Sequence, residues 1–254
     1  MVVRVEVMTS KGRPGWTTRA AVLLPNPITT PFTFWYLAVL LATTILQRVV
    51  GETVSAKLLA MSSTDALNLW HRPVMSLISS ALWISDSGWA AYVVIFALAV
   101  APLERRVGAG WTFAVFASGH VLATLATELP VMWALRGGLL PRTDGRWLDI
   151  GVSYGFFATA GAMVTVLAPG LRRWAALAIL LCIGVIYVTD EPGSLLAVVT
   201  LAGHLTAALI GLFGWRGWVH RRGLAGTLKF RGTPFRAERD RVRPAAALAG
   251  STRP

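Results

Sequence analysis

The sequence predicts an all-α membrane protein that crosses the bilayer six times. Hydrophobic residues make up 55% of the 254 residues and charged residues only 14%, and the mean hydropathy is +0.59. The apolar residues are gathered in runs of roughly 15–22, close to the length of helix that crosses the hydrocarbon core. A soluble domain would spread the same residues through amphipathic segments, so the predicted class is a polytopic membrane protein.

Each predicted span ends where a charge, a proline or a glycine halts an apolar run. Glu104-Arg105-Arg106 follows the second run, Pro130 the third and Pro169-Gly170 the fourth. Apolar residues in the long connection between the first two spans predict short helices that lie at the membrane interface. The sequence leaves open whether 73–84 is one of them or extends the second span. The six predicted spans are 32–50, 88–103, 111–129, 150–167, 174–188 and 194–215.

The basic residues predict the orientation of the chain. Of the 24 Lys and Arg residues, 18 fall on the side that holds both termini, together with only four of the 12 acidic residues. The positive-inside rule therefore predicts that both termini are cytoplasmic. Abundant Arg and Ala with scarce Lys suggests a GC-rich bacterial genome, and hence an inner (plasma) membrane. The predicted domains are a cytoplasmic arm over 1–30, a membrane domain over 31–216 and a basic, disordered tail over 217–254.

The charge distribution and the cysteine content limit which ligands and binding partners the protein can be expected to have. Ten of the basic residues lie from Arg216 onward, and each contributes about 1 kcal/mol when held near an anionic membrane surface. The expected partner of the tail is therefore the inner leaflet and not nucleic acid, because no basic fold with interleaved aromatic residues is visible. The single Cys182 excludes an internal disulfide and is expected to be a buried, inert thiol. No metal-ligand spacing is present, so we expect neither a metal nor a cofactor.

Two residues that could carry out nucleophilic catalysis occur inside predicted spans. Ser153 opens the fourth span within Gly151-Val152-Ser153-Tyr154-Gly155, and His204 lies inside the sixth. An ionisable group at membrane depth is costly and is usually functional. Small residues at four-residue spacing would let the two helices approach closely. These residues are Gly151 and Gly155 in the fourth span, and Gly203, Ala207 and Gly211 in the sixth.

Each of these residues also has a structural interpretation. Alone, Ser153 is more simply a small residue that bonds back to its own helix, and His204 could form an interhelical hydrogen bond. The joint placement favours a dyad in which His204 accepts the Ser153 proton and later protonates the leaving amine. The Gly-x-Ser-x-Gly pattern also occurs in soluble hydrolases, but no alternating strands and helices surround it here. His120 in the third span is expected to be structural, bonded to Thr124 or Glu128, and the alternative is that it contributes to the cavity of the site.

In their order across six spans, these residues resemble the rhomboid intramembrane serine proteases over roughly 70–215. The resemblance rests on Leu103-Glu104-Arg105-Arg106-Val107-Gly108 after the second span, on Gly151-x-Ser153, and on His204 followed by Ala207 and Gly211. It implies a six-helix rhomboid-like bundle. It also implies an endopeptidase that cleaves transmembrane substrates near their outer ends, with Ser153 as nucleophile and His204 as base.

The resemblance also locates the supporting residues. The family's oxyanion-binding His and Asn fall at Gly88 and Tyr92, so the Tyr92 hydroxyl and the Ser153 backbone N–H are the remaining candidates for the oxyanion, with Gly151 beside them. The aromatic residue that packs on the base would be Phe157. Because loss of one oxyanion donor costs about 10²–10³ in rate, a non-catalytic rhomboid-like scaffold that binds transmembrane helices is the alternative. A transporter is disfavoured because no inverted repeat is evident.

Overall fold

The computed structural model describes residues 24–85, 88–141 and 145–228, and these residues confirm an all-α fold. Among the described residues, four stretches are long and apolar enough to cross a membrane, including Leu195–Arg221. The described elements are α2 (Pro31–Val49), α3 (Glu52–Ser62), α4 (Ala66–His71), α5 (Pro73–Ser80), α6 (Trp89–Leu98), α7 (Val100–Val107), α8 (Ala109–Arg136), α9 (Val152–Val166), α10 (Pro169–Thr189), α11 (Leu195–Leu209), a π-helical turn (Ile210–Gly214) and α12 (Arg216–Arg221).

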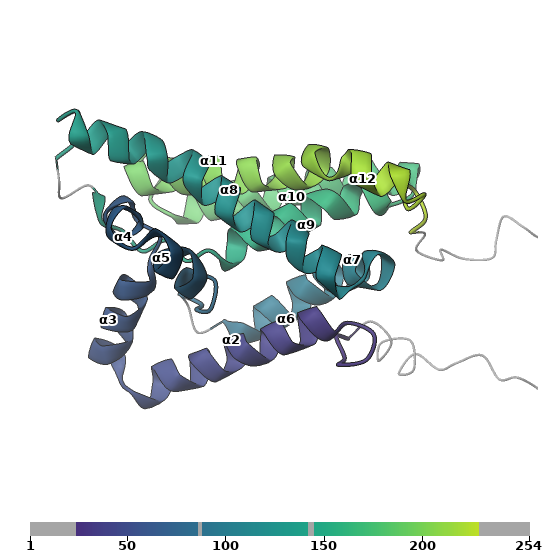
Figure 1. Cartoon of the computed structure of the whole chain (residues 1–254), viewed down its shortest axis with the longest axis horizontal. Helices are drawn as coiled ribbons and strands as arrows, with labels where there is room; N and C mark the ends of the chain where they lie inside the picture. The colour runs from purple at the N-terminus through teal and green to yellow at the C-terminus, as the bar shows by residue number, and fades with distance from the viewer. Residues whose placement is uncertain (1–23, 86–87, 142–144, 229–254) are drawn as a thin grey trace, which may run out of the picture.

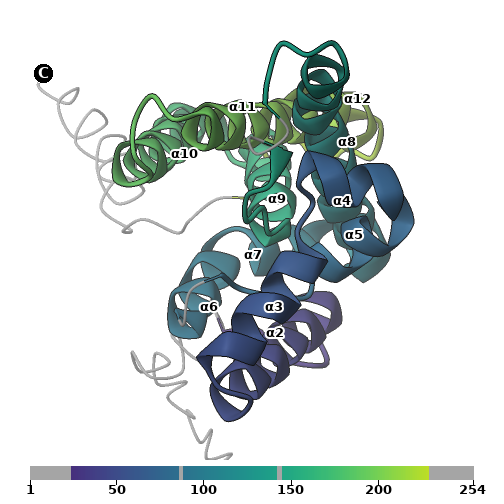
Figure 2. The ribbon, with the colours of Figure 1, turned by 90° about the vertical axis from the view of Figure 1, so that its left-hand side faces the viewer.

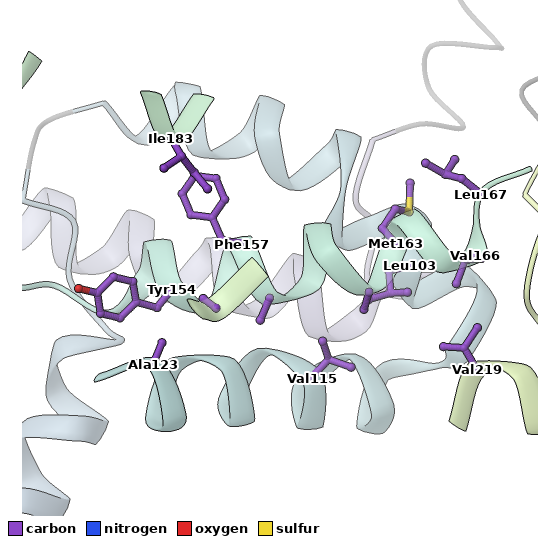
Figure 3. Packing of buried hydrophobic residues seen from close by; sticks show 13 residues of the cluster. Leu103, Val115, Ala123, Tyr154, Phe157, Met163, Val166, Leu167, Ile183 and Val219 are labelled. Carbon is purple, nitrogen blue, oxygen red and sulfur yellow. The ribbon is translucent and has the colours of Figure 1, made fainter. Parts of the chain in front are cut away.

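Helix α9 lies at the centre of the bundle. All of its residues from Phe157 to Val166 are buried, and a helix that is apolar all round belongs in the interior. Figure 2 shows α9 with α8, α10 and α11 on one side and α6 and α7 on the other. In the packing around it, Phe157 lies beside Ile183 of α10, and Tyr154 points away from them (Figure 3).

The bundle has two ends, which carry different short helices. Helix α9 begins at the end that holds the short helices α3, α4 and α5, which we call the Ser153 end (Figure 1). It finishes at the end that holds α7 and α12, which we call the Glu104 end. The short helices confirm that the first long connection is helical, and they make 73–80 a separate helix that does not extend the next span.

The second predicted span is wrong as a single helix. It divides at Ala99, whose φ of −121° and ψ of −54° separate α6 from α7. The cause is Pro102, because a proline inside a helix removes one N–H and its ring clashes with the carbonyl four residues earlier, here that of Leu98. The break leaves Pro102 in the first turn of α7, where proline is tolerated.

Two further expectations need correction. The third span does not stop at Pro130, because α8 runs through this residue to Arg136; apolar surroundings and neighbouring helices allow proline inside membrane helices. Cys182 is exposed on α10 and not buried, since almost all of that helix faces outward. At the other boundary, α12 starts at Arg216, and the chain beyond it pairs Leu228 with Leu167. The described chain therefore continues past 216 as far as 228, and the expected domain boundary at 216/217 stays a prediction.

Candidate active site

Ser153 is the second residue of α9, and it lies on the more open side of that helix. Its side chain is half-buried, whereas Val152, Tyr154 and Gly155 around it are buried. Val152 packs into the cluster formed with α2 and α6, while Tyr154 packs into the cluster formed with α11. At 100° of rotation per residue, these directions leave Ser153 facing the seam between α6 and α11.

His204 is buried on α11 against aromatic side chains of α9. Only 3% of its surface is exposed. Its ring centroid lies 4.6 Å from that of Phe157, with 50° between the planes, and 5.3 Å from that of Tyr154, edge to face. Phe157 thus contacts His204. Since Phe157 lies one turn beyond Ser153 on α9, the imidazole occupies the side of α9 next to the one that Ser153 faces.

The hydroxyl and the imidazole are not hydrogen-bonded to each other. Neither Nδ1 nor Nε2 of His204 has a hydrogen-bond partner among the described residues. A buried polar group without a partner is uncommon and costs about 1–3 kcal/mol. Helices α9 and α11 pack directly on each other, so no helix intervenes between the two residues.

Small residues allow α9 and α11 to pack closely, although only some of the residues expected to do so take part. A Cβ added to Gly211 would lie 1.8 Å from the backbone oxygen of Ala158, and one added to Gly161 would lie 2.1 Å from that of Ala208. Gly203 likewise leaves room for the Tyr154 ring. These glycines bring α9 and α11 together, as the spacing predicted for the sixth span.

Gly155 of α9 and Gly151, which directly precedes the helix, pack against a different neighbour. A Cβ at Gly155 would lie 2.3 Å from the Phe116 ring, and one at Gly151 would lie 1.8 Å from Cε1 of His120. Both Phe116 and His120 belong to α8. Residues 151 and 155 are 200° from Ser153 on the helix, so they face α8 and not α11. Their four-residue spacing was visible in the sequence, but the neighbour they face was not.

The loop before α9 is joined to the connection between α3 and α4 by a group of hydrogen bonds that we call the loop clasp. The backbone N–H of Thr64 donates to the Asp149 carbonyl at 3.0 Å, and its hydroxyl donates to Asp149 Oδ2 at 3.0 Å. The Ser63 hydroxyl donates to the Trp147 carbonyl at 2.8 Å and accepts from the Asp149 N–H at 3.0 Å. The clasp fixes the chain four residues before Ser153.

Burial in the clasp raises the pKa of Asp149 to about 6; the Thr64 hydroxyl opposes this rise and nearby Asp65 adds to it. No role for Asp149 was predicted from the sequence. The run Ser62-Ser63-Thr64-Asp65 was the available signal, because such residues commonly bond to nearby backbone.

The remaining candidates lie further from Ser153 along the chain. Gly88 precedes α6 as its N-terminal flanking residue. Tyr92, one turn into α6, packs near Phe96 with ring centroids 6.4 Å apart. The expected bond from His120 to Thr124 or Glu128 is not formed. Instead, its Nε2 lies 2.8 Å from the Leu77 carbonyl of α5.

Comparison with known protein families identifies the family of this chain. Residues 28–222, from before α2 to the end of α12, match the family described as rhomboid-like protein. No curated protein and no solved structure matches the chain significantly. Since the match covers most of the chain, this multi-pass, all-α membrane protein belongs to the family of rhomboid-like proteins.

Proposed function

We propose that this protein is an intramembrane serine endopeptidase, with Ser153 as nucleophile and His204 as base. The observation that carries the proposal is the state of His204: it is buried against Phe157 and Tyr154, and neither ring nitrogen has a hydrogen-bond partner among the described residues. Its helix, α11, packs on α9, in which Ser153 is the second residue. A buried imidazole kept without a partner is costly for stability alone. Its retention supports a role that needs a free nitrogen.

In the proposed reaction, His204 takes the Ser153 proton as Oγ attacks the scissile carbonyl. The resulting imidazolium then gives that proton to the leaving amine, which leaves an acyl-enzyme on Ser153. Water, deprotonated by His204, attacks the ester carbonyl. As the ester bond to Ser153 breaks, His204 returns the proton to Oγ, and the new carboxyl terminus is released. The missing Ser–His hydrogen bond is compatible with this sequence, because catalytic hydrogen bonds are often long until substrate binds.

The start of α9 is suited to hold the oxyanion. The first amide of α9 that bonds back along the backbone is that of Gly155, to the Gly151 carbonyl at 3.4 Å. The amides of Val152, Ser153 and Tyr154 therefore have no backbone acceptor among the described residues. Free amides at the positive end of a helix stabilise a developing negative charge. We propose the Ser153 amide as the main donor, with Tyr92 as a second.

The proposal includes the setting of the site in the bilayer. Six spans, with α6 and α7 counted as one, would place the Ser153 end outside and both termini in the cytoplasm of a bacterial inner membrane. A substrate transmembrane helix would reach Ser153 through the half-exposed seam beside α6. The basic chain after Arg216 would rest on anionic lipids of the inner leaflet.

A non-catalytic scaffold that binds transmembrane helices is the second candidate. The unformed hydrogen bond between Ser153 and His204 favours it, as do Gly88 and Tyr92 at the positions where the family's oxyanion pair is expected. On this alternative the same seam beside α6 would hold a partner helix without cleaving it.

Labelling and cleavage distinguish the two candidates. We would reconstitute the full chain in liposomes with a transmembrane substrate whose helix is destabilised near its outer end, and treat it in parallel with a fluorophosphonate. The protease predicts cleavage and covalent labelling, both lost in Ser153→Ala and His204→Ala. Ser55→Ala and His220→Ala, on α3 and α12, are matched controls that should keep both.

The scaffold predicts the opposite pattern. Neither cleavage nor labelling would occur at high protein concentration, and photo-crosslinking to the substrate helix would be equal in wild type and Ser153→Ala. That result, obtained with protein that is monodisperse and thermally stable, would contradict the proposal that the protein is a protease.

A further inference from the structure

His120 is a buried junction between three helices. Only 4% of its surface is exposed on α8. Its Nε2 lies 2.8 Å from the Leu77 carbonyl and 3.4 Å from the Ser80 hydroxyl, both of α5. A carbonyl only accepts hydrogen bonds, so Nε2 carries the proton and Nδ1 is left as an acceptor. Nδ1 has no partner within the described part of the chain.

The ring of His120 also lies close to Gly151, at the start of α9. A Cβ built on Gly151 would be 1.8 Å from Cε1 and 2.2 Å from Nδ1 of the imidazole. Only glycine therefore fits at this position, two residues before Ser153. The unpaired Nδ1 lone pair lies next to the end of α9 whose amides lack backbone acceptors, and the positive end of a helix favours an acceptor and opposes an imidazolium.

We propose that His120 is a positioning residue: it joins α5 to Gly151 and thereby sets the place of Ser153 and of the free amides at the start of α9. This inference rests on the proposed function. His120 acts through the backbone and not by contact with substrate, because Gly151 faces α8 on the side of α9 opposite to Ser153. Misplacement of a reacting group by about 1 Å can cost 10²-fold in rate.

Two substitutions separate the hydrogen bond from the bulk of the ring. Gln places an amide N–H near the position of Nε2, whereas Asn places one near Nδ1. We expect His120→Gln to keep cleavage and labelling within about fivefold of wild type. We expect His120→Asn and His120→Ala to lower kcat about 100-fold while KM changes less than about twofold. Equal rates for the Gln and Asn variants, in protein of matched thermal stability, would overturn the proposal.

A double mutant tests the contact with Gly151. Gly151→Ala alone should displace the start of α9 and abolish labelling, because its Cβ meets the imidazole. Combined with His120→Ala, the added methyl group has room, so the double mutant should label faster than Gly151→Ala. If the two substitutions act independently, the double mutant will be the slowest of all, and the contact has no positioning role.

A thiol probe reads the position of residue 153 without relying on proteolysis. Ser153→Cys in a Cys182→Ala background leaves a single thiol in the chain, and its alkylation rate by a small maleimide reports where that side chain lies. We expect His120→Ala and His120→Asn to change this rate at least about threefold, and His120→Gln to leave it unchanged. If wild type neither cleaves nor labels, the proposed function fails while this rate still decides the role of His120. An alkylation rate that is the same in all four proteins would refute it.

Discussion

The carboxylate of Glu104 on α7 caps the start of α2 through Thr33. Glu104 Oε2 accepts the Thr33 backbone N–H at 2.9 Å and its hydroxyl at 2.6 Å, while Oε1 accepts the Phe32 N–H at 2.7 Å. Glu104 is only 2% exposed. The first amides of a helix have no partner within it, and a carboxylate there is favoured by the helix dipole. The Glu of the Glu-Arg pattern therefore joins two helices at the end of the bundle away from Ser153.

Removal of this cap should destabilise the bundle without changing the chemistry at Ser153. Glu104→Ala leaves buried donors of α2 unpaired, and we expect a loss of about 2–4 kcal/mol in the free energy of unfolding. Glu104→Gln retains one acceptor oxygen and should lose about half as much. Thermal unfolding in detergent measures both, with Glu52→Gln on the exposed start of α3 as the neutral control. A Glu104→Ala protein as stable as the control would contradict the capping role.

The contact between Gly211 and Ala158 predicts a steric limit on the α9–α11 interface. Gly211→Ala drives a methyl group into a backbone oxygen 1.8 Å away, so the helices must separate. Overpacking of this kind costs about 1–3 kcal/mol, and it should also slow fluorophosphonate labelling by moving His204 away from Ser153. Gly184→Ala on α10, where nothing lies within 4 Å of the added carbon, should leave stability and labelling unchanged.

The fold class was predictable because the length of an apolar run can be read directly along the sequence, without knowing which helices pack together. The apolar runs located α2, α9, and α11 with the π-helical turn that follows it, to within two residues at each end, whereas α8 and α10 extend at least five residues beyond one predicted end. The break at Ala99 was in principle visible in Pro102, whereas the passage of α8 through Pro130 depends on neighbouring helices that no local pattern encodes.

The candidate site was predictable only in part, because contacts between helices depend on rotation about each axis. The pairing of α9 with α11 follows from glycine spacing, but the sequence did not show that Gly151 faces His120 on α8. Nor did it show the loop clasp, whose partners lie 84–86 residues apart. Loops of this kind carry no periodicity, so their pairing appears only when the helices are in place.

The ring contact between Phe157 and His204 predicts a role for Phe157 in holding the base. Phe157→Leu keeps most of the apolar volume but removes the ring face, so the imidazole gains freedom and labelling of Ser153 should fall about tenfold. Phe157→Ala leaves a cavity and should also lower stability by about 3–5 kcal/mol. Phe156→Leu is the matched control, because Phe156 stacks on Phe96 of α6 at 6.0 Å. If both Leu variants label alike, Phe157 does not position the base.

The raised pKa of Asp149 predicts that the loop clasp is tighter in mild acid. The folded state holds the Asp149 proton to about pH 6, whereas an ordinary aspartate loses it near 3.8. The folded state therefore binds this proton more strongly than the unfolded chain does. The resulting contribution to stability is complete below about pH 4 and is lost as the pH rises through about 6.

Hydrogen exchange of the backbone amides at residues 63–65 and 147–149 should accordingly show greater protection at pH 5 than at pH 7.5, after correction for intrinsic exchange rates. Asp149→Asn keeps an acceptor for the Thr64 hydroxyl without a charge, so its protection at pH 7.5 should match that of wild type at pH 5. Asp65, whose pKa is also raised by burial, still titrates in this variant and leaves a smaller dependence. Asp190→Asn, exposed at the end of α10, should keep the full wild-type dependence. Protection that is the same at both pH values in wild type would show that the charge on Asp149 does not weaken the clasp before Ser153.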